Sequence, residues 1–282
     1  MGVKLGSFAV AAIAVVASLV WALVLEPASL RNEDYQFAIP NWPAGCDGLR
    51  IAVLADLHVG SPFNGPDKLD RVIARTGQAH PDLILLAGDF VIHGVRGGTF
   101  TPPEQIATAL RQLSAPLGVW AVLGNHDWWF DAPRVRAALE AVGIPVLDDT
   151  AIAIGSPSCD FWLVGISDYW EGRHDVTGAL AQVTDEAPVL AFTHNPDVFP
   201  DVPARVSLTI AGHTHGGQVY IPFFGRPVVP SKYGERYAIG HIVEDGRHLF
   251  VTPGLGTSII PVRFLVPPEI SVLTVRSAST NR

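Results

Sequence analysis

The chain has 282 residues and carries 19 Lys and Arg against 27 Asp and Glu, a formal net charge of −8. Hydrophobic residues make up 48% of it and charged residues 16%, a composition that excludes a disordered chain. The acidic balance argues against nucleic acid as a partner, because binding a phosphate backbone requires a basic surface. The two cysteines, Cys46 and Cys159, could form one bridge, but we expect free buried thiols.

The N-terminal segment is apolar. Residues 5–25 carry no charged side chain, and a helix of that length extends roughly 31 Å, enough to cross a hydrocarbon core. Trp21 lies near one end, where an indole prefers the headgroup region. We therefore expect residues 1–25 to form a single-pass cell-membrane anchor; a cleaved signal peptide and a buried helix are the alternatives. Because Lys4 precedes the span, the positive-inside rule predicts that the rest of the chain faces the extracytoplasmic side.

The remainder divides into a short segment and one large domain. Residues 26–47 contain Pro27, Pro40 and Pro43 and are interpreted as a linker or an edge segment, and residues 48–282 as a single domain. Apolar runs predict strands, and apolar periodicity with caps at Thr101 and Asp131 predicts helices. The predicted strands are 49–55, 82–87, 117–123, 161–166, 188–193, 206–211, 237–243, 248–252 and 269–275, and the predicted helices are 66–79, one from 101, and 131–142.

Early β-α-β units followed by more strands than helices indicate two packed sheets with helices outside them. The expected fold is α/β: a four-layer α/β/β/α sandwich of two mixed β-sheets flanked by helices, preceded by an N-terminal transmembrane helix.

Polar motifs follow five of the predicted strands. The carboxyl ends of strands build the ligand site in open α/β sheets, so we expect these motifs to meet. Residues two apart face the same side of an extended segment, as Asp56 and His58 do, and also His213 and His215. Imidazoles mixed with carboxylates favour first-row divalent metals over Mg²⁺ or Ca²⁺. The motifs are Asp56-Leu-His58, Gly88-Asp89, Gly124-Asn-His-Asp127, Thr193-His194 and Gly212-His-Thr-His215.

This order of motifs, D-x-H, GD, GNHD, H and GHTH, resembles the calcineurin-like metallophosphoesterase superfamily over about residues 49–276. The segments 209–218, 253–258, 261–263 and 267–269 further resemble a bacterial membrane-associated phosphodiesterase subgroup. One departure is Phe90, because phosphoprotein phosphatases continue their GD motif into a longer pattern with an Asp-Arg pair. A protein phosphatase is therefore disfavoured.

The resemblance implies two divalent metal ions, which could be Mn, Fe or Zn, and a hydroxide between them that attacks phosphorus in line. It implies that His126 contacts the substrate phosphate and protonates the leaving oxygen, while Asp127 orients its ring. One metal would be held by Asp56, His58, Asp89 and His215, and the other by Asp89, Asn125, His194 and His213.

Several substrates and functions stay open. A phosphodiester or pyrophosphate is favoured, and a lipid-linked ester of the UDP-2,3-diacylglucosamine type is one candidate by similarity. Such a substrate would require a site facing the cytoplasm, opposite to the side that the charges predict. The alternatives are a phosphomonoesterase and a non-catalytic metal-binding scaffold. A metallo-β-lactamase-like hydrolase is disfavoured because the sequence lacks an early H-x-H-x-D-H run.

Two aromatic segments, 128–130 and 220–225, could form an apolar lip near the metals or pack in the core. His93 could reach the site or lie on a surface loop. For Arg263 and Glu269 we expect an ion pair rather than contact with substrate.

Overall fold

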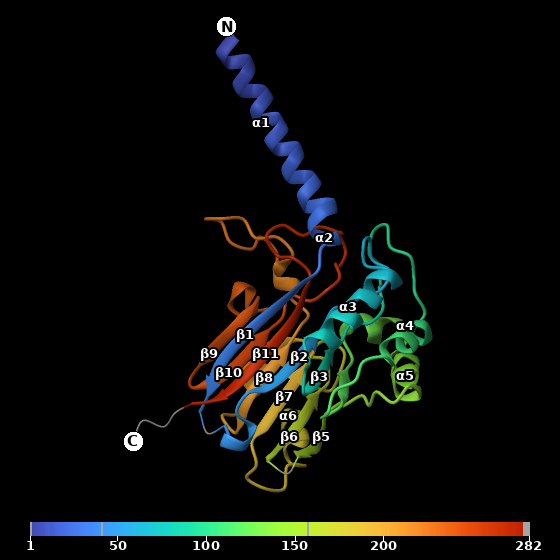
Figure 1. Ribbon diagram of the computed structural model, residues 1–282, viewed down its shortest axis with the longest axis vertical. Coiled ribbons are helices and arrows are strands. Elements are labelled where there is room, and N and C mark those ends of the chain that lie inside the picture. Colours follow the sequence, from blue (N-terminus) through green and yellow to red (C-terminus); the bar gives the residue numbers. More distant parts are fainter. Residues whose placement is uncertain (1, 41, 157, 279–282) are drawn as a thin grey trace.

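The computed structural model describes residues 2–40, 42–156 and 158–278, and its centre is a pair of β-sheets (Figure 1). The first sheet has five strands in the order β1 (Arg31–Ile39), β11 (Glu269–Ser277), β2 (Leu49–Leu54), β3 (Leu83–Ala87) and β4 (Val119–Val122). The second has six strands in the order β5 (Thr150–Ser156), β6 (Cys159–Ile166), β7 (Val189–Thr193), β8 (Val206–Ala211), β10 (Arg247–Val251) and β9 (Gly240–Glu244). The helices are α1 (Gly2–Val20), α2 (Glu26–Ala28), α3 (Pro66–Gln78), α4 (Pro103–Leu110), α5 (Asn125–Ala141) and α6 (Val176–Leu180).

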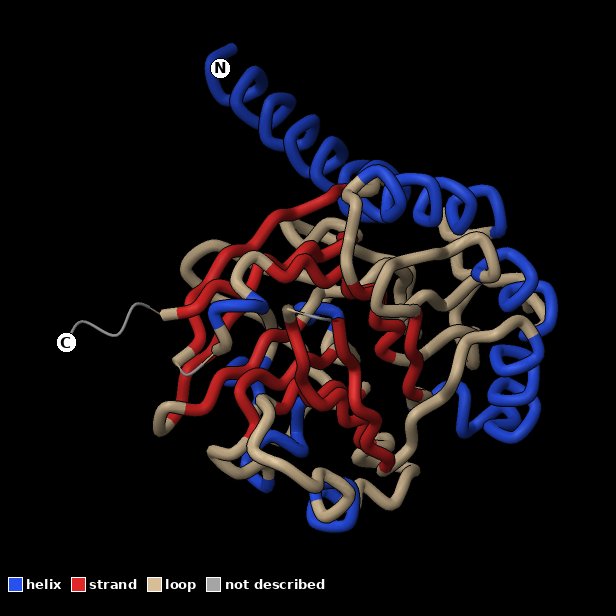
Figure 2. Tube along the Cα trace, turned by 60° about the horizontal axis from the view of Figure 1, so that its bottom comes forward, coloured by secondary structure: helices blue, strands red, loops and turns tan. Residues whose placement is uncertain are grey.

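Both sheets are mixed. In the first, β2, β3 and β4 run parallel, whereas β11 pairs antiparallel with β2. In the second, β6, β7, β8 and β10 run parallel and the edge strands β5 and β9 are antiparallel. The two sheets and the outer helices can be followed in Figure 2. The parallel strands bring their carboxyl ends to the same end of the molecule, which is where the polar motifs begin.

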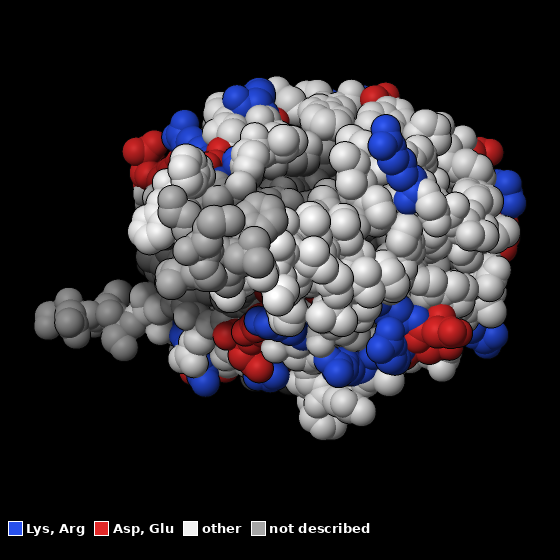
Figure 3. Space-filling view, turned by 90° about the horizontal axis from the view of Figure 1, so that it is seen from above, with Lys and Arg blue, Asp and Glu red and all other residues white. Residues whose placement is uncertain are grey.

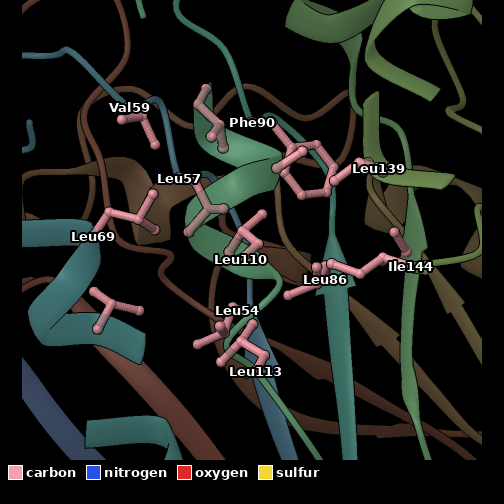
Figure 4. Packing of buried hydrophobic residues seen from close by; sticks show 14 of the residues in the cluster. Leu54, Leu57, Val59, Leu69, Leu86, Phe90, Leu110, Leu113, Leu139 and Ile144 are labelled. Atoms are coloured by element: carbon pink, nitrogen blue, oxygen red, sulfur yellow. The ribbon is translucent and has the colours of Figure 1, made fainter. Parts of the chain in front are cut away.

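Alternation along the strands builds the layers. In β7, Leu190 and Phe192 pack between the sheets, whereas Val189 and Ala191 face outward toward α6. On the other side, α3, α4 and α5 cover the first sheet, and their leucines interdigitate with Leu54 and Leu86 of the strands (Figure 4). The four-layer α/β/β/α prediction is confirmed, although among the described residues the layer over the second sheet consists of the short helix α6 and short 3-10 turns.

Some expected elements differ. Strand β5 was not predicted, because its apolar run is only four residues long and six of its seven residues are at least partly exposed. The cap expected at Thr101 is absent, since α4 begins at Pro103 with Pro102 as the preceding residue and no side-chain cap. Helix α5 begins at Asn125, ahead of the predicted start at Asp131, where the chain kinks and the Asp131 carboxylate accepts the Arg134 amide at 3.1 Å.

Between α2 and β2, Arg31–Ile39 forms β1, the first strand of its sheet, which pairs parallel with the whole length of β11. The expectation of free thiols is wrong. Cys46, after β1, forms a disulfide with Cys159 at the start of β6, with 4.7 Å between their Cα atoms. The two residues are 113 apart in sequence, so only the packing of the sheets brings them together.

The N-terminal helix projects from one end of the domain (Figure 1). The segment Ala9–Ala28 is long and apolar enough to cross a membrane, with a mean hydropathy of 2.4. Only 6% of this segment is buried, which contradicts the alternative of a buried helix. Its last turns are fixed to the domain: the Glu26 carboxylate accepts the Leu265 and Val266 amides, and the Ala22 carbonyl accepts the Arg263 amide at 2.9 Å. Met1 lies outside the described residues.

Candidate metal centre

The seven residues predicted as metal ligands meet at the carboxyl ends of five strands. Asp56 and His58 follow β2, Asp89 follows β3 and Asn125 follows β4, all from the first sheet. His194 follows β7 and the pair His213 and His215 follows β8, from the second sheet. All seven side chains are buried, with exposed fractions of 4% or less. The site therefore lies where the ends of the two sheets face each other.

Four of these side chains form a first group of donor atoms. The Nε2 atoms of His58 and His215 lie 3.2 Å apart. The Nε2 of His58 lies 3.4 Å from Oδ2 of Asp89, and the Nε2 of His215 lies 3.4 Å from Oδ1 of Asp56.

A second group of four shares one atom with the first. The Nε2 of His194 lies 3.3 Å from Oδ2 of Asp89, 3.1 Å from Oδ1 of Asn125 and 3.1 Å from Nδ1 of His213. Because Oδ2 of Asp89 approaches an imidazole of each group, that one oxygen lies between the two sets of donors.

The donor set fits divalent cations. Donor atoms around one ion at bond lengths near 2.1 Å lie roughly 3 to 3.5 Å apart, as these do. Within the described ranges, Oδ1 of Asp56 is a buried carboxylate oxygen without a hydrogen-bond partner, which is costly unless a cation compensates it. Mixed imidazole and carboxylate ligands favour Mn, Fe or Zn. His58 and Asp89 also lie within reach of His126.

The backbone at the site is strained. Five of the seven residues, none of them glycine, have φ in the left-handed region: 52° at Asp56, 38° at His58, 58° at Asp89, 69° at His213 and 51° at His215. Each such residue costs on the order of 1–3 kcal/mol, and such residues cluster at functional sites. The fold thus holds these loops in conformations that turn the side chains toward one another.

Burial and mutual charge decide the proton affinities of the site. Burial raises the pKa of Asp56 to about 7 and lowers the pKa of His58 to about 3. Burial also acts on Asp89, but the imidazoles of His194 and His126 outweigh it, so the pKa of Asp89 lies well below its usual value. Conversely, the Asp89 carboxylate overcomes burial and raises the pKa of His194 to about 10. Asp89 is the dominant negative charge of the centre.

Asp127 does not contact the imidazole of His126, contrary to expectation. Its Oδ1 accepts the amides of Phe90 and Val91 at 2.9 and 3.2 Å, and its Oδ2 accepts those of Asp89 and Gly124, both at 2.9 Å. The carboxylate therefore fixes the loop that carries Asp89. Gly124 is required here, because a Cβ on it would lie 2.6 Å from the Asp89 backbone nitrogen.

His126 lies at the border between the metal centre and a cavity. Its Nδ1 accepts the backbone amide of His93 at 3.2 Å, so its ring hydrogen lies on Nε2 in the neutral form. Nε2 lies 3.4 Å from Oγ of Ser258, which also lines the cavity. Burial lowers the pKa of His126. His93 therefore reaches the site mainly through its backbone.

Arg263 and Glu269 do not form the expected ion pair. The buried Arg263 guanidinium donates to the carbonyls of Pro253, Gly254, Gly256 and Val266 at 2.6–3.2 Å. The Gly256 amide in turn donates to the Asp56 carbonyl at 2.6 Å. Arg263 thus holds the loop behind the first donor group, and its backbone contacts the end of the N-terminal helical segment at Ala22.

The cavity beside His126 and the two donor groups has a volume of about 470 Å³. Of the first aromatic segment, Trp129 lines it, with its ring 4.9 Å from that of His126, while Trp128 and Phe130 pack on the core under α5. The second segment, 220–225, is exposed beside the cavity and does not pack in the core.

Two residues of the site were missed from the sequence. Asp168 is fully buried, and its Oδ2 accepts the amides of Trp170 and Glu171, both at 2.9 Å. Trp170 lines the cavity with its ring 4.4 Å from that of His213. Both residues follow the end of β6. The strand-end pattern that identified the other motifs could therefore have identified Asp168 and Trp170 as well.

Comparison with known proteins agrees with this geometry. A family model described as calcineurin-like phosphoesterase matches residues 49–217. The chain is 31% identical to the metallophosphoesterase YkuE of Bacillus subtilis over 92% of this chain and 90% of that protein. It is 34% identical to the phosphodiesterase YaeI of Escherichia coli over 79% and 81%. It is 27% identical to the UDP-2,3-diacylglucosamine pyrophosphatase LpxG of Chlamydia trachomatis over 90% and 92%. This chain therefore belongs to the calcineurin-like phosphoesterase family and is a metal-dependent hydrolase of phosphoric ester bonds.

Proposed function

We propose that this chain hydrolyses phosphodiester or pyrophosphate bonds with two divalent cations. The observation that carries the proposal is the pair of donor groups that share Oδ2 of Asp89. Asp56, His58, Asp89 and His215 would hold one cation, and Asp89, Asn125, His194 and His213 the other. Two such cations supply a nucleophile at neutral pH by lowering the pKa of water, and they offset charge on the phosphate oxygens.

His126 serves the reaction as a proton donor. The amide of His93 occupies Nδ1 and directs the remaining ring hydrogen on Nε2 toward the cavity that admits the ester. There Nε2 donates this proton to the leaving oxygen as that oxygen gains negative charge. Asp127 is a positioning residue, because it holds the Asp89 loop through backbone amides.

We expect His126→Ala to retain both metal ions while kcat falls by roughly 10²–10⁴, the usual contribution of such a group. The Nε2 donor is lost, but His126 contributes only its backbone amide to the Asp89 carboxylate, and this bond survives the change. Metal content by mass spectrometry and turnover of a chromogenic diester measure the two effects. Loss of a metal in this variant would make His126 a ligand and contradict its assigned role.

The cavity favours a bulky, weakly charged ester. Within the described residues, its lining includes no Lys or Arg that would pair with a phosphate dianion, which disfavours a small phosphomonoester. Apolar side chains, among them Val219, Ile259 and Val262, line the part beside the exposed segments. One relative carries the name of a phosphodiesterase and another that of a pyrophosphatase of a diacylated nucleotide sugar. A lipid-linked diester or pyrophosphate is therefore the substrate class we propose.

A screen of the metal-loaded full chain against monoesters, small diesters and lipid pyrophosphates tests this proposal. The double change Phe223→Ser and Phe224→Ser is expected to weaken turnover of amphiphilic esters by on the order of tenfold or more. A phenyl ring that becomes buried against the lipid part of the substrate contributes about 1.5–3 kcal/mol to binding. Turnover of a small chromogenic diester should stay unchanged, as should both activities of Val243→Ser, an exposed control on β9. Two bound metals without turnover of any ester would favour the scaffold alternative, and equal loss on both substrates would contradict a role of the phenylalanines in binding the lipid part of the ester.

We also propose that the domain is anchored by its N-terminal helix and lies on the extracytoplasmic side. The apolar segment Ala9–Ala28 supports the anchor. Lys4 ahead of the span and the disulfide both support this side, because disulfides persist in oxidising compartments. Its lipid-linked substrate would then be one displayed on the outer leaflet.

A further inference from the structure

Two loops expose a set of large apolar side chains at one end of the domain. Phe223 and Phe224 have exposed fractions of 103% and 85%, and the other members are also exposed. Contiguous apolar patches of this kind on a protein surface mark interaction sites. We call the set the apolar loop surface: Phe223, Phe224, Val228, Ile259, Ile260 and Leu265.

The apolar loop surface is fixed to the end of the anchor helix. The Leu265 amide donates to the Glu26 carboxylate at 2.9 Å, and the Arg263 amide donates to the Ala22 carbonyl at 2.9 Å. In Figure 1 the loop around residues 255–265 lies beside α2, where the anchor leaves the domain, and the loop around residues 220–228 lies at the same end and extends away from α2. Because the exposed apolar residues Trp21, Leu23, Val24 and Leu25 end at the same level, a bilayer crossed by the anchor would meet these loops.

The two loops are also tied to each other. The Tyr220 amide donates to the Phe264 carbonyl at 2.8 Å, and the Gln218 side chain accepts the Ser258 amide at 2.8 Å. Phe223, Ile259 and Leu265 have φ of 71°, 58° and 57°, a region unfavourable for bulky side chains. Backbone bonds between the loops hold these conformations and keep the three side chains outward.

The charges fit a lipid surface. Seen along the anchor, most of the charged side chains in view lie toward the rim of this end of the domain (Figure 3). The Arg226 guanidinium stacks over the Tyr220 ring, which places a cation beside the first loop. Apolar tips with flanking cations are the composition of segments that insert at a membrane interface.

We propose that the apolar loop surface inserts into the membrane leaflet next to the anchor. The anchor and the two loops then form a two-point attachment, which stops the domain from swinging on a single helix. Ile259, Ile260 and Val228 also line the cavity beside the donor groups. The inserted loops therefore set the mouth of the cavity against the lipid headgroups. This inference concerns the orientation of the domain and does not require that a lipid-linked ester be the substrate.

Site-directed spin labelling of the full chain in phosphatidylcholine and phosphatidylglycerol vesicles tests the proposal. A nitroxide is attached to Phe223→Cys, Ile259→Cys or Val243→Cys, one at a time, with Cys46 and Cys159 left in their disulfide. Val243 is the matched control, because it is exposed and pairs with His248 at the start of β10, the end away from the site. The readout is the accessibility of each label to dissolved oxygen, which concentrates in lipid, and to a water-soluble nickel chelate.

Labels at positions 223 and 259 should be more accessible to oxygen than to nickel, and the label at 243 should show the reverse. Equal behaviour at all three positions would overturn the proposal. Spin–spin broadening at 223 or 259 at high dilution in lipid would also overturn it, because the loops would then contact a second copy of the chain. Since no turnover is measured, failure here is distinct from failure of the proposed activity.

Discussion

Replacing Asp89 by Ala is expected to remove both the paired metal ions and the activity. Oδ2 of Asp89 lies 3.4 Å from His58 Nε2 and 3.3 Å from His194 Nε2, so one oxygen serves both donor groups. Without its charge, two cations would repel each other with no shared anion between them. The loss of activity should be on the order of 10³-fold or more, because a metal supplies several kcal/mol of charge stabilisation.

The measurement is the number of ions per chain after metal loading and desalting, together with hydrolysis of a diester. Asp70→Ala is the matched control, since Asp70 is an exposed carboxylate on the outer helix α3 and belongs to neither donor group. It should keep both ions and full turnover. If Asp89→Ala kept two ions, the shared-oxygen arrangement would be contradicted. If Asp89→Asn kept the ions but not the turnover, its charge would matter for the reaction rather than for binding.

Among the proposed substitutions, removing the disulfide is expected to lower the free energy of unfolding the most. Cys46 and Cys159 close a loop over a sequence separation of 113 residues and link the segment before β2 to β6. The loop-closure model assigns a bridge of this span on the order of 4–5 kcal/mol, chiefly through the unfolded chain. Trp42 packs beside the bridge, with its indole donating to the Cys46 carbonyl at 2.9 Å, so this corner of the core would also loosen.

Thermal unfolding of the solubilised full chain measures the effect. The double change Cys46→Ala and Cys159→Ala should lower Tm by roughly 10 °C, at about 2–4 °C per kcal/mol for a domain of this size. A reductant should lower the Tm of the original chain to the same value and leave the double variant unchanged. In cells quenched and denatured in acid, a thiol-reactive polymer should label neither cysteine before reduction. Labelling without reductant would place the domain in the reducing compartment and contradict the proposed side.

The site could be read from the sequence because of how parallel strands end. Asp56, Asp89, Asn125, His194 and His213 each stand within three residues of the end of a strand. The carboxyl ends of parallel strands lie at one edge of the sheet. Motifs that directly follow such strands therefore come close together in the fold even when they are far apart in the sequence. The structure brings together all seven predicted ligands. Their role in binding metal stays a prediction that the Asp89 experiment tests.

Other features were decided only by tertiary contacts. Asp127 follows His126 directly, yet its carboxylate accepts four amides from two loops instead of contacting that ring. Arg263 was matched with Glu269 by charge, yet it donates to backbone carbonyls. Side-chain partners of this kind depend on directions and distances across loops, which residue types and spacing do not contain.

The sequence by itself determined the apolar N-terminal segment, the alternation of buried strands with helices, and the strand-end motifs, because each is written in local periodicity or composition. The packing of the two sheets decided the rest. It paired Cys46 with Cys159 and placed a single carboxylate oxygen between two donor groups. These are long-range consequences of how one sheet lies on the other, and no local pattern specifies that relation.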